Sequence, residues 1–169
     1  RVAKESGLKV EVGGGIRDMK TIEYYLERGI ERVILGSVAV KNPELVKEAV
    51  KEFKERIAVG IDAKNGMVAV EGWEKVSDKT AISLALAMKD IGVKTIVYTD
   101  ISKDGMLSGP NIEQTKLLSD KTGIDIIASG GMSCMDDLRN VYKAGIHGAI
   151  MGKSLYEKKI ILKDAVKEF

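Results

Sequence analysis

The sequence repeats itself at an interval of 116 residues. Residues 14–53 align with residues 130–169 without a gap, and 13 of the 40 aligned positions are identical. The identical positions include four glycines and the five residues that end each copy. An internal repeat of this kind predicts two equivalent structural units, each with the same order of strands and helices.

Short β-forming runs alternate with amphipathic helical runs along the whole chain. Strands are predicted at residues 8–12, 32–35, 57–61, 95–99, 124–128 and 149–151. Helices are predicted at residues 19–28, 44–53, 82–91, 112–121, 135–143 and 162–169. Left-handed caps are expected where four of these helices end, at Gly29, Gly92, Gly123 and Gly145. Strict alternation indicates parallel β/α units.

The repeat also predicts the size of the complete fold. Residues 56–123, with two strands and two helices, precede the second copy, and their counterpart before the first copy would need about sixty residues ahead of residue 1. We therefore expect residues 1–169 to be a single domain that holds units 3 to 8 of a (β/α)8 TIM barrel built from two half-barrels. An open six-stranded parallel sheet also explains the alternation, but it does not explain the half-repeat.

Composition restricts the classes of partner and cofactor. Lys plus Arg number 27 and Asp plus Glu 25, a formal charge of +2, so neither a nucleic-acid nor a membrane partner is expected. With 44% hydrophobic and 31% charged residues, the chain is typical of a globular domain. One cysteine, Cys134, is consistent with a cytoplasmic protein, and one histidine with one cysteine leaves no cluster of metal ligands to expect.

Glycine turns follow the predicted strands at equivalent places in the two copies. Gly14-Gly15 and Gly36 belong to the first copy, and Gly130-Gly131 and Gly152 belong to the second. Glycine lets backbone N–H groups approach an anion closely, and functional residues of a barrel gather at the carboxyl ends of its strands. The duplicated pair predicts two phosphate sites, although tight turns alone would also require glycine.

Several polar and aromatic residues near the strand ends are candidates for chemistry. Asp62 follows a buried strand and is expected to face the barrel mouth as a general acid, unless it is a capping or ion-paired aspartate. Thr99 ends a strand, and Asp104 belongs to an Asp-Gly turn signal. Trp73, the only tryptophan, follows the hairpin signal Asn65-Gly66 and can stack on a heterocycle or anchor a loop.

In combination these motifs resemble the ProFAR isomerase family of histidine biosynthesis. The resemblance extends over the whole chain, and the segments that carry it are residues 10–17, 36–37, 42–44, 60–63, 72–73, 98–111 and 128–131. It implies an aldose–ketose isomerase that performs an Amadori rearrangement on a small bis-phosphate substrate. It also implies the absence of a cofactor or metal, and a monomer when the barrel is complete.

The resemblance assigns roles to particular residues. It implies that Asp62 is the general acid, that Thr99 and Asp104 assist it, and that Arg17 and Trp73 contact the substrate. The residues that match the phosphate sites are Gly15, Gly36, Ser37, Gly105, Gly130, Gly131, Gly152 and Lys153.

One departure from the family pattern affects activity. The family's general base is an aspartate on the first barrel strand, which by the repeat would precede residue 1, so we expect this chain alone to be inactive. Three alternatives stay open. They are the cyclase subunit of imidazole glycerol phosphate synthase, a dual-substrate relative that also uses phosphoribosyl anthranilate, and a non-catalytic phosphate-binding barrel fragment. The Gly72-Trp73 pair and residues 98–100 favour the isomerase over the cyclase.

Overall fold

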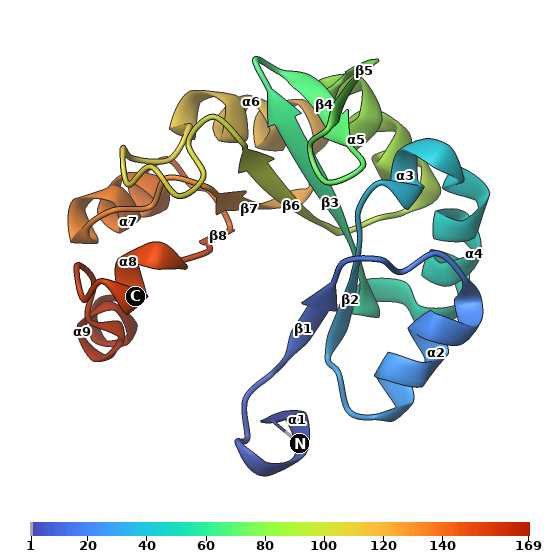
Figure 1. Ribbon diagram of the computed structural model, residues 1–169, viewed down its shortest axis with the longest axis horizontal. Helices are drawn as coiled ribbons and strands as arrows, with labels where there is room; N and C mark the ends of the chain where they lie inside the picture. Colours follow the sequence, from blue (N-terminus) through green and yellow to red (C-terminus); the bar gives the residue numbers. More distant parts are fainter. Residues whose placement is uncertain (1) are drawn as a thin grey trace.

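Six strands of the computed structural model, which describes residues 2–169, form one parallel sheet in the order β1-β2-β3-β6-β7-β8. Their bounds are β1 Glu11–Gly13, β2 Arg32–Leu35, β3 Ile57–Lys64, β6 Thr95–Asp100, β7 Asp125–Ser129 and β8 Gly148–Ala149. Figure 1 shows the sheet curving so that β1 and β8 lie at its two open ends. The expected part-barrel of about six β/α units is confirmed.

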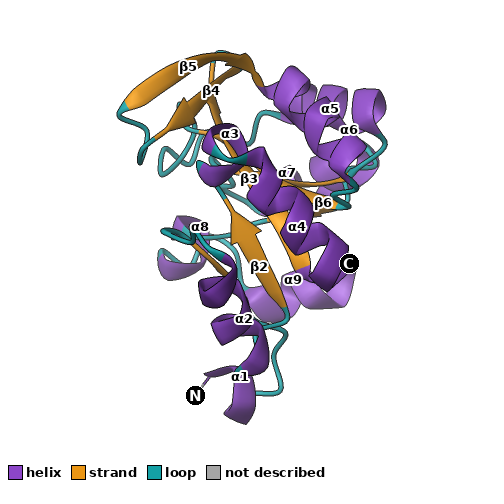
Figure 2. Ribbon diagram, turned by 90° about the vertical axis from the view of Figure 1, so that its right-hand side faces the viewer, coloured by secondary structure: helices purple, strands orange, loops and turns teal. Residues whose placement is uncertain are grey.

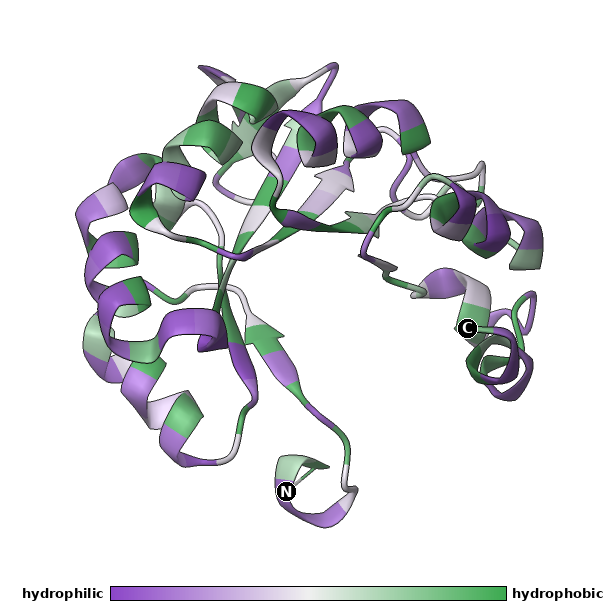
Figure 3. Cartoon of the chain, turned by 180° about the vertical axis from the view of Figure 1, so that it is seen from behind, coloured by the Kyte–Doolittle hydropathy of each residue, from purple (hydrophilic) through white to green (hydrophobic). Residues whose placement is uncertain are grey.

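Helices cover the outer face of the curved sheet. The longer ones are α2 Met19–Glu27, α4 Pro43–Phe53, α5 Ala81–Ile91, α6 Ile112–Thr122, α7 Met135–Lys143 and α9 Leu162–Glu168. The shorter ones are α1 Val2–Glu5, α3 Val38–Lys41, η1 Lys54–Arg56 and α8 Lys153–Tyr156. Figure 3 shows hydrophobic and hydrophilic residues alternating along each helix, as one-sided packing requires. Among the helices of residues 2–169, none has the length and apolar character needed to cross a membrane.

Local sequence signals explain where the helices begin and end. The side chains of Asp18, Asn42, Thr80 and Asn111 accept hydrogen bonds from backbone N–H groups in the first turns of α2, α4, α5 and α6. The four glycines expected at helix ends all have positive φ, from 68° to 102°. The predicted left-handed caps are therefore confirmed.

The structure corrects the boundaries of the first and last predicted strands. The strand predicted at residues 8–12 begins only at Glu11, because β2 begins at Arg32, its partner in the register. The strand predicted at residues 149–151 is Gly148–Ala149, because its register with β7 covers only those two residues.

A β-hairpin on β3 was not predicted from the sequence, apart from its first turn. Asn65 and Gly66, with φ of 51° and 78°, connect β3 to the antiparallel strand β4 Met67–Val70, which confirms the hairpin turn signal. A second turn leads to β5 Lys75–Thr80, which pairs with β4. Figures 1 and 2 show this hairpin at the carboxyl end of β3.

The two copies of the repeat have different surroundings. Val50 on α4 is 9% exposed, and its Cγ1 would be 3.6 Å from a Cβ on Gly92 at the end of α5, whereas its counterpart Val166 on α9 is 71% exposed. In the same way Val46 is fully buried while its counterpart Leu162 is 53% exposed. Within residues 2–169, α9 has no neighbour equivalent to α5, because β8 is the last strand of the sheet.

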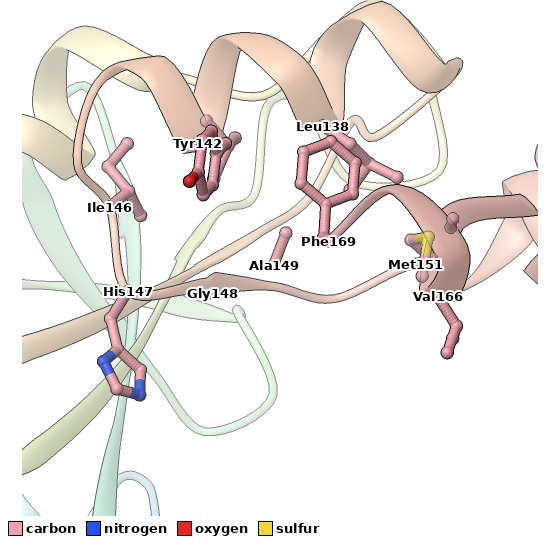
Figure 4. A pocket seen from close by; sticks show the side chains of 11 residues that line it. Leu138, Tyr142, Ile146, His147, Gly148, Ala149, Met151, Val166 and Phe169 are labelled. Carbon is pink, nitrogen blue, oxygen red and sulfur yellow. The ribbon is translucent and has the colours of Figure 1, made fainter.

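An apolar groove marks the open end of the sheet beside β8. It has a volume of about 440 Å³ and lies between α7, β8 and α9 (Figure 4). The rings of Tyr142 and Phe169 lie 5.5 Å apart, centroid to centroid, and both residues line the groove. Because its lining is mostly apolar, the groove lacks the convergent polar groups of a catalytic site.

The buried and exposed valines of the repeat provide a matched stability test. Val50→Ala is expected to lower the free energy of unfolding by about 2 kcal/mol, because it removes buried methyl groups. Val166→Ala is expected to change it by less than about 0.5 kcal/mol, because that side chain is already in water. Urea unfolding of both variants measures the difference, and equal destabilisation by the two substitutions would contradict the exposure described here.

Candidate active site

A first cavity of about 540 Å³ lies at the carboxyl ends of β1, β2 and β3. It brings together both glycine turns of the first repeat copy with Asp62 and the tip of the β4–β5 hairpin. Its polar and glycine lining consists of Gly14, Gly15, Arg17, Gly36, Ser37, Gly60, Asp62, Glu71 and Gly72.

A second cavity of about 270 Å³ lies at the carboxyl ends of β7 and β8. Its lining includes Asp104, Gly105, Ser129, Gly130, Gly131, Gly152 and Lys153. The Lys153 ammonium group donates a hydrogen bond of 2.9 Å to the backbone oxygen of Gly105, which joins α8 to the loop after β6. Both glycine turns of the second repeat copy therefore meet at one cavity, in the same relation as in the first copy.

The glycines of the two cavities are required for two different reasons. Gly14, Gly15, Gly130 and Gly131 have φ between 70° and 100°, which disfavours any side chain, and a Cβ on Gly131 would collide with the backbone of Gly109. Gly36 and Gly152 are different, because neither has a positive φ and a Cβ on either would meet nothing within 4 Å. Neither a positive φ nor a close neighbour requires glycine at these two equivalent positions, whereas a ligand that fills the adjacent space would account for both.

Asp62 lies near the carboxyl end of β3, with strands bonded on both sides. In the register it is opposite Thr99 of β6 and Ala69 of β4. Its carboxylate is half-buried, and Oδ2 accepts a hydrogen bond of 2.8 Å from the indole Nε1–H of Trp73. The sequence named both residues as candidates but contained no sign that they contact each other.

The turn between β4 and β5 carries Trp73 to this position. Glu71, Gly72 and Trp73 all have positive φ, of 58°, 67° and 75°. The backbone N–H of Glu71 donates to Ser37 Oγ at 3.2 Å, and the Glu71 carboxylate accepts from Lys41 at 2.7 Å and lies 2.8 Å from the Lys75 ammonium. Hydrogen bonds from Lys41 and then Lys75 lower the pKa of Glu71 to about 2.

Asp104 and Asp62 line different cavities, so the two carboxylates do not share one site. Asp104 lies in the exposed loop after β6, where its backbone N–H donates to the Asp100 oxygen at 3.2 Å. Thr99 lies between the two cavities, since it is opposite Asp62 in the register and its Cγ2 would be 3.5 Å from a Cβ on Gly130. Of the three predicted catalytic residues, Asp62 and Thr99 are therefore neighbours.

Asp100, which the sequence left as a possible cap, stabilises the loop between β6 and α6. Its Oδ1 accepts from the Ser102 hydroxyl at 2.6 Å and the Ser102 N–H at 3.0 Å, and its Oδ2 accepts from Asn111 at 2.6 Å. Burial raises the pKa of Asp100, but the hydrogen bonds from Ser102 and Asn111 outweigh this, and the pKa lies below its ordinary value.

The single histidine, His147, and the single cysteine, Cys134, lie apart from both cavities. His147 Nδ1 is 3.3 Å from Asp125 Oδ1, at the amino ends of β7 and β8, and Cys134 is an exposed free thiol ahead of α7. In the part of the chain that the structure describes, no three His, Cys, Asp or Glu side chains gather as they would around a metal ion. The absence of a metal or cofactor requirement stays a prediction.

This fold and site define a class of parallel β/α proteins in which paired glycine turns line cavities at the carboxyl ends of the strands. A family model described as "Histidine biosynthesis protein" matches residues 1–161, and the chain belongs to that family.

Three relatives show high similarity to this chain. The relative from Lachnoclostridium phytofermentans is 56% identical over 169 residues, which cover 99% of this chain and 71% of the relative. Those from Acetivibrio thermocellus and Thermoanaerobacter pseudethanolicus are each 52% identical over 166 residues, 98% of this chain and 70% of the relative. Each is named 1-(5-phosphoribosyl)-5-((5-phosphoribosylamino)methylideneamino) imidazole-4-carboxamide isomerase, or ProFAR isomerase.

Asp100→Asn tests whether this carboxylate stabilises the fold. It is expected to lower the free energy of unfolding at pH 7 by about 1–3 kcal/mol, because the amide NH2 that replaces Oδ2 cannot accept the hydrogen bond from Asn111. Because the folded-state pKa is lowered, the wild-type advantage is present above the unfolded-state pKa near 3.9 and is lost as the pH falls through the folded value. Urea unfolding of both proteins between about pH 7 and pH 3 measures this difference, and an equal difference at all pH values would contradict the assignment.

Proposed function

We propose that this chain supplies the general acid and both phosphate sites for the ProFAR isomerase reaction of histidine biosynthesis, which acts on a small-molecule substrate with a phosphate at each end. The equivalence of the two cavities carries the proposal. Gly36 and Gly152 occupy matching places in the repeat, and each leaves open space that the fold itself does not need. Two such places suit a substrate with two similar ends.

The first cavity would hold one phosphate between the turns Gly14-Gly15 and Gly36-Ser37, with Arg17 as the positive charge. The second would hold the other phosphate among Gly105, Gly130-Gly131 and Gly152, with Lys153 as its cation. Backbone N–H groups freed by glycine can donate to phosphate oxygens without a side chain in the way. Asp104 lines the second cavity and would position the loop that closes it.

Asp62 would act between the two phosphates as the general acid. It gives a proton to the ribose ring oxygen while the C1′–O bond breaks, and a Schiff base forms. Removal of the C2′ proton by a base then gives an enolamine, which collapses to the ketose. None of residues 2–169 is assigned as this base. Thr99, beside Asp62 in the sheet, can orient the substrate with its hydroxyl.

The alternatives receive less support. The relatives described above carry the isomerase name, which favours this reaction over the ammonia-dependent cyclisation. A non-catalytic fragment would not require Asp62 to face the first cavity. We further propose that residues 1–169 act as one domain of a cytoplasmic enzyme that is monomeric in its complete form; the single cysteine is consistent with that compartment.

The role of Asp62 can be tested in a chimera that joins this chain to the part of the Lachnoclostridium phytofermentans relative outside the match. We expect the chimera to convert ProFAR to its ribulosyl isomer without ammonia. Asp62→Asn is expected to lower kcat/KM by about 10²–10⁴-fold, because an amide cannot donate the proton. The matched control is Asp78→Asn on the exposed strand β5, which should leave turnover unchanged. Full activity of the Asp62→Asn chimera would remove Asp62 from the mechanism, and turnover of the ribulosyl isomer with ammonia would identify a cyclase.

Gly36→Ala and Gly152→Ala separate ligand binding from stability. Gly36→Ala is expected to raise the free energy of unfolding by about 0.4–1 kcal/mol, because alanine has less freedom in the unfolded chain and its Cβ meets no neighbour. No such gain is expected for Gly152→Ala, because the φ of −103° and ψ of −94° at Gly152 lie outside the regions that alanine adopts. Both substitutions should weaken the binding of inorganic phosphate about tenfold or more, a loss of about 1.4 kcal/mol, because the methyl group occupies the ligand's space. Calorimetric titration and urea unfolding measure the two effects. Unchanged phosphate affinity in both variants would show that these glycines do not shape a phosphate site.

A further inference from the structure

We propose that Glu71 is a positioning residue: by holding Lys41 and Lys75 together, it fixes the turn between β4 and β5 against α3 and so sets the Trp73 indole on the Asp62 carboxylate. The inference deepens the proposed function, because it concerns the side chain assigned there as the acid. Below, Lys41, Glu71 and Lys75 together are called the Glu71 anchor.

The contacts of Glu71 connect two strand ends that are distant in sequence. Lys41 ends α3, which follows β2, whereas Glu71 lies in the turn that ends β4. Two contacts cross between them, namely the 2.7 Å contact of Lys41 with the carboxylate and the 3.2 Å bond from the Glu71 N–H to Ser37 Oγ. Figure 2 shows the hairpin directly above α3. Lys75, 2.8 Å from the same carboxylate, ties it to the first residue of β5.

The backbone conformation of this turn is energetically unfavourable, so contacts from other elements are needed to stabilise it. Glu71 and Trp73 are non-glycine residues in the left-handed region, which costs on the order of 1–3 kcal/mol for each residue. The hairpin itself is irregular, because its register shifts between Met67 and Ala69, and β5 is largely exposed. The contacts to α3 are therefore what hold the turn in place.

The Trp73–Asp62 bond has a direct consequence for proton donation. An indole N–H can only donate, so Oδ2 of Asp62 is used as an acceptor. The oxygen left to carry the acid proton is Oδ1. Glu71 lines the same cavity as Asp62, but its hydrogen bonds and ion pairs are with Ser37, Lys41 and Lys75, so we infer that it acts on Asp62 through Trp73.

The Glu71 anchor is accessible to solvent, which makes it sensitive to salt. The Glu71 side chain is 33% exposed, and those of Lys41 and Lys75 are 53% and 69% exposed. Ion pairs with this exposure are weakened as the Debye length shortens. The turn is thus held by contacts that high ionic strength can loosen without unfolding the sheet.

Trp73 provides the readout, because it is the only tryptophan in the chain. Glu71→Gln keeps the side-chain length and removes the charge. We expect it to raise the acrylamide quenching constant of Trp73 fluorescence by up to about twofold, as the indole opens from 45% exposure toward full exposure. Lys41→Gln should act in the same direction. The matched control is Glu74→Gln, the same substitution at an exposed residue of the same turn, which should leave quenching unchanged.

Two further measurements distinguish positioning from general loosening. Asp62→Ala alone should also raise quenching, because it removes the acceptor of the indole N–H, and the Glu71→Gln/Asp62→Ala double variant should show no more than the larger single effect, because both changes break one coupled contact. Raising salt from about 0.05 to about 1 M should raise quenching in the wild type but not in Glu71→Gln. Additive effects, or equal changes in Glu71→Gln and Glu74→Gln, would overturn the proposal.

The readout does not depend on turnover, so the two hypotheses can fail separately. If the chimera shows no isomerase activity while quenching follows the pattern above, the positioning role of Glu71 is supported and the proposed isomerase function is wrong. If Asp62→Asn abolishes turnover while Glu71→Gln leaves Trp73 quenching at its wild-type value, the proposed isomerase function is supported and the positioning role of Glu71 is wrong.

Discussion

The site depends on the way strand β3 changes partners along its length. Its first residues pair with β2 through Ile57, Ala58 and Val59, whereas its last residues pair with β4. Throughout Val59–Ala63 the other edge stays bonded to β6. This switch leaves the carboxyl end of β2 free to turn into the first cavity and provides the start of the hairpin that returns to it. Asp62 of β3 lies between β4 and β6, opposite Ala69 and Thr99. The pairing of these strands therefore determines which residues surround Asp62.

The duplicated sequence occupies two unequal environments. In the first copy, β3 and α5 cover α4, and Val46 and Val50 are buried. In the second copy, the same apolar positions on α9 face solvent, because β8 is the last strand among the described residues. Hydrophobic pattern alone therefore predicts which face of a helix is suited to burial. Whether that face is buried depends on the neighbour that the sheet supplies.

The meeting of the glycine turns at two cavities was the most predictable part of the site. The repeat placed Gly14-Gly15 with Gly36 and Gly130-Gly131 with Gly152, and each set meets at one cavity. This prediction succeeded because glycine turns after parallel strands converge at one edge of a sheet, a relation that strand order already implies. The contact between Trp73 and Asp62 could not be predicted in this way, since it depends on a hairpin for which only the Asn65-Gly66 turn left a clear signal.

The sequence by itself determined the alternation of strands and helices, the left-handed helix ends and the equivalence of the two glycine pairs, because these follow from local conformational preference and from the repeat. The tertiary structure decided which candidates share a cavity. It placed Asp104 at the second cavity and away from Asp62, and it brought Glu71 to Lys41, 30 residues earlier in the chain. Such meetings depend on strand register and on turns with positive φ at non-glycine residues. Local sequence preference disfavours those turns, and only contacts from distant elements stabilise them.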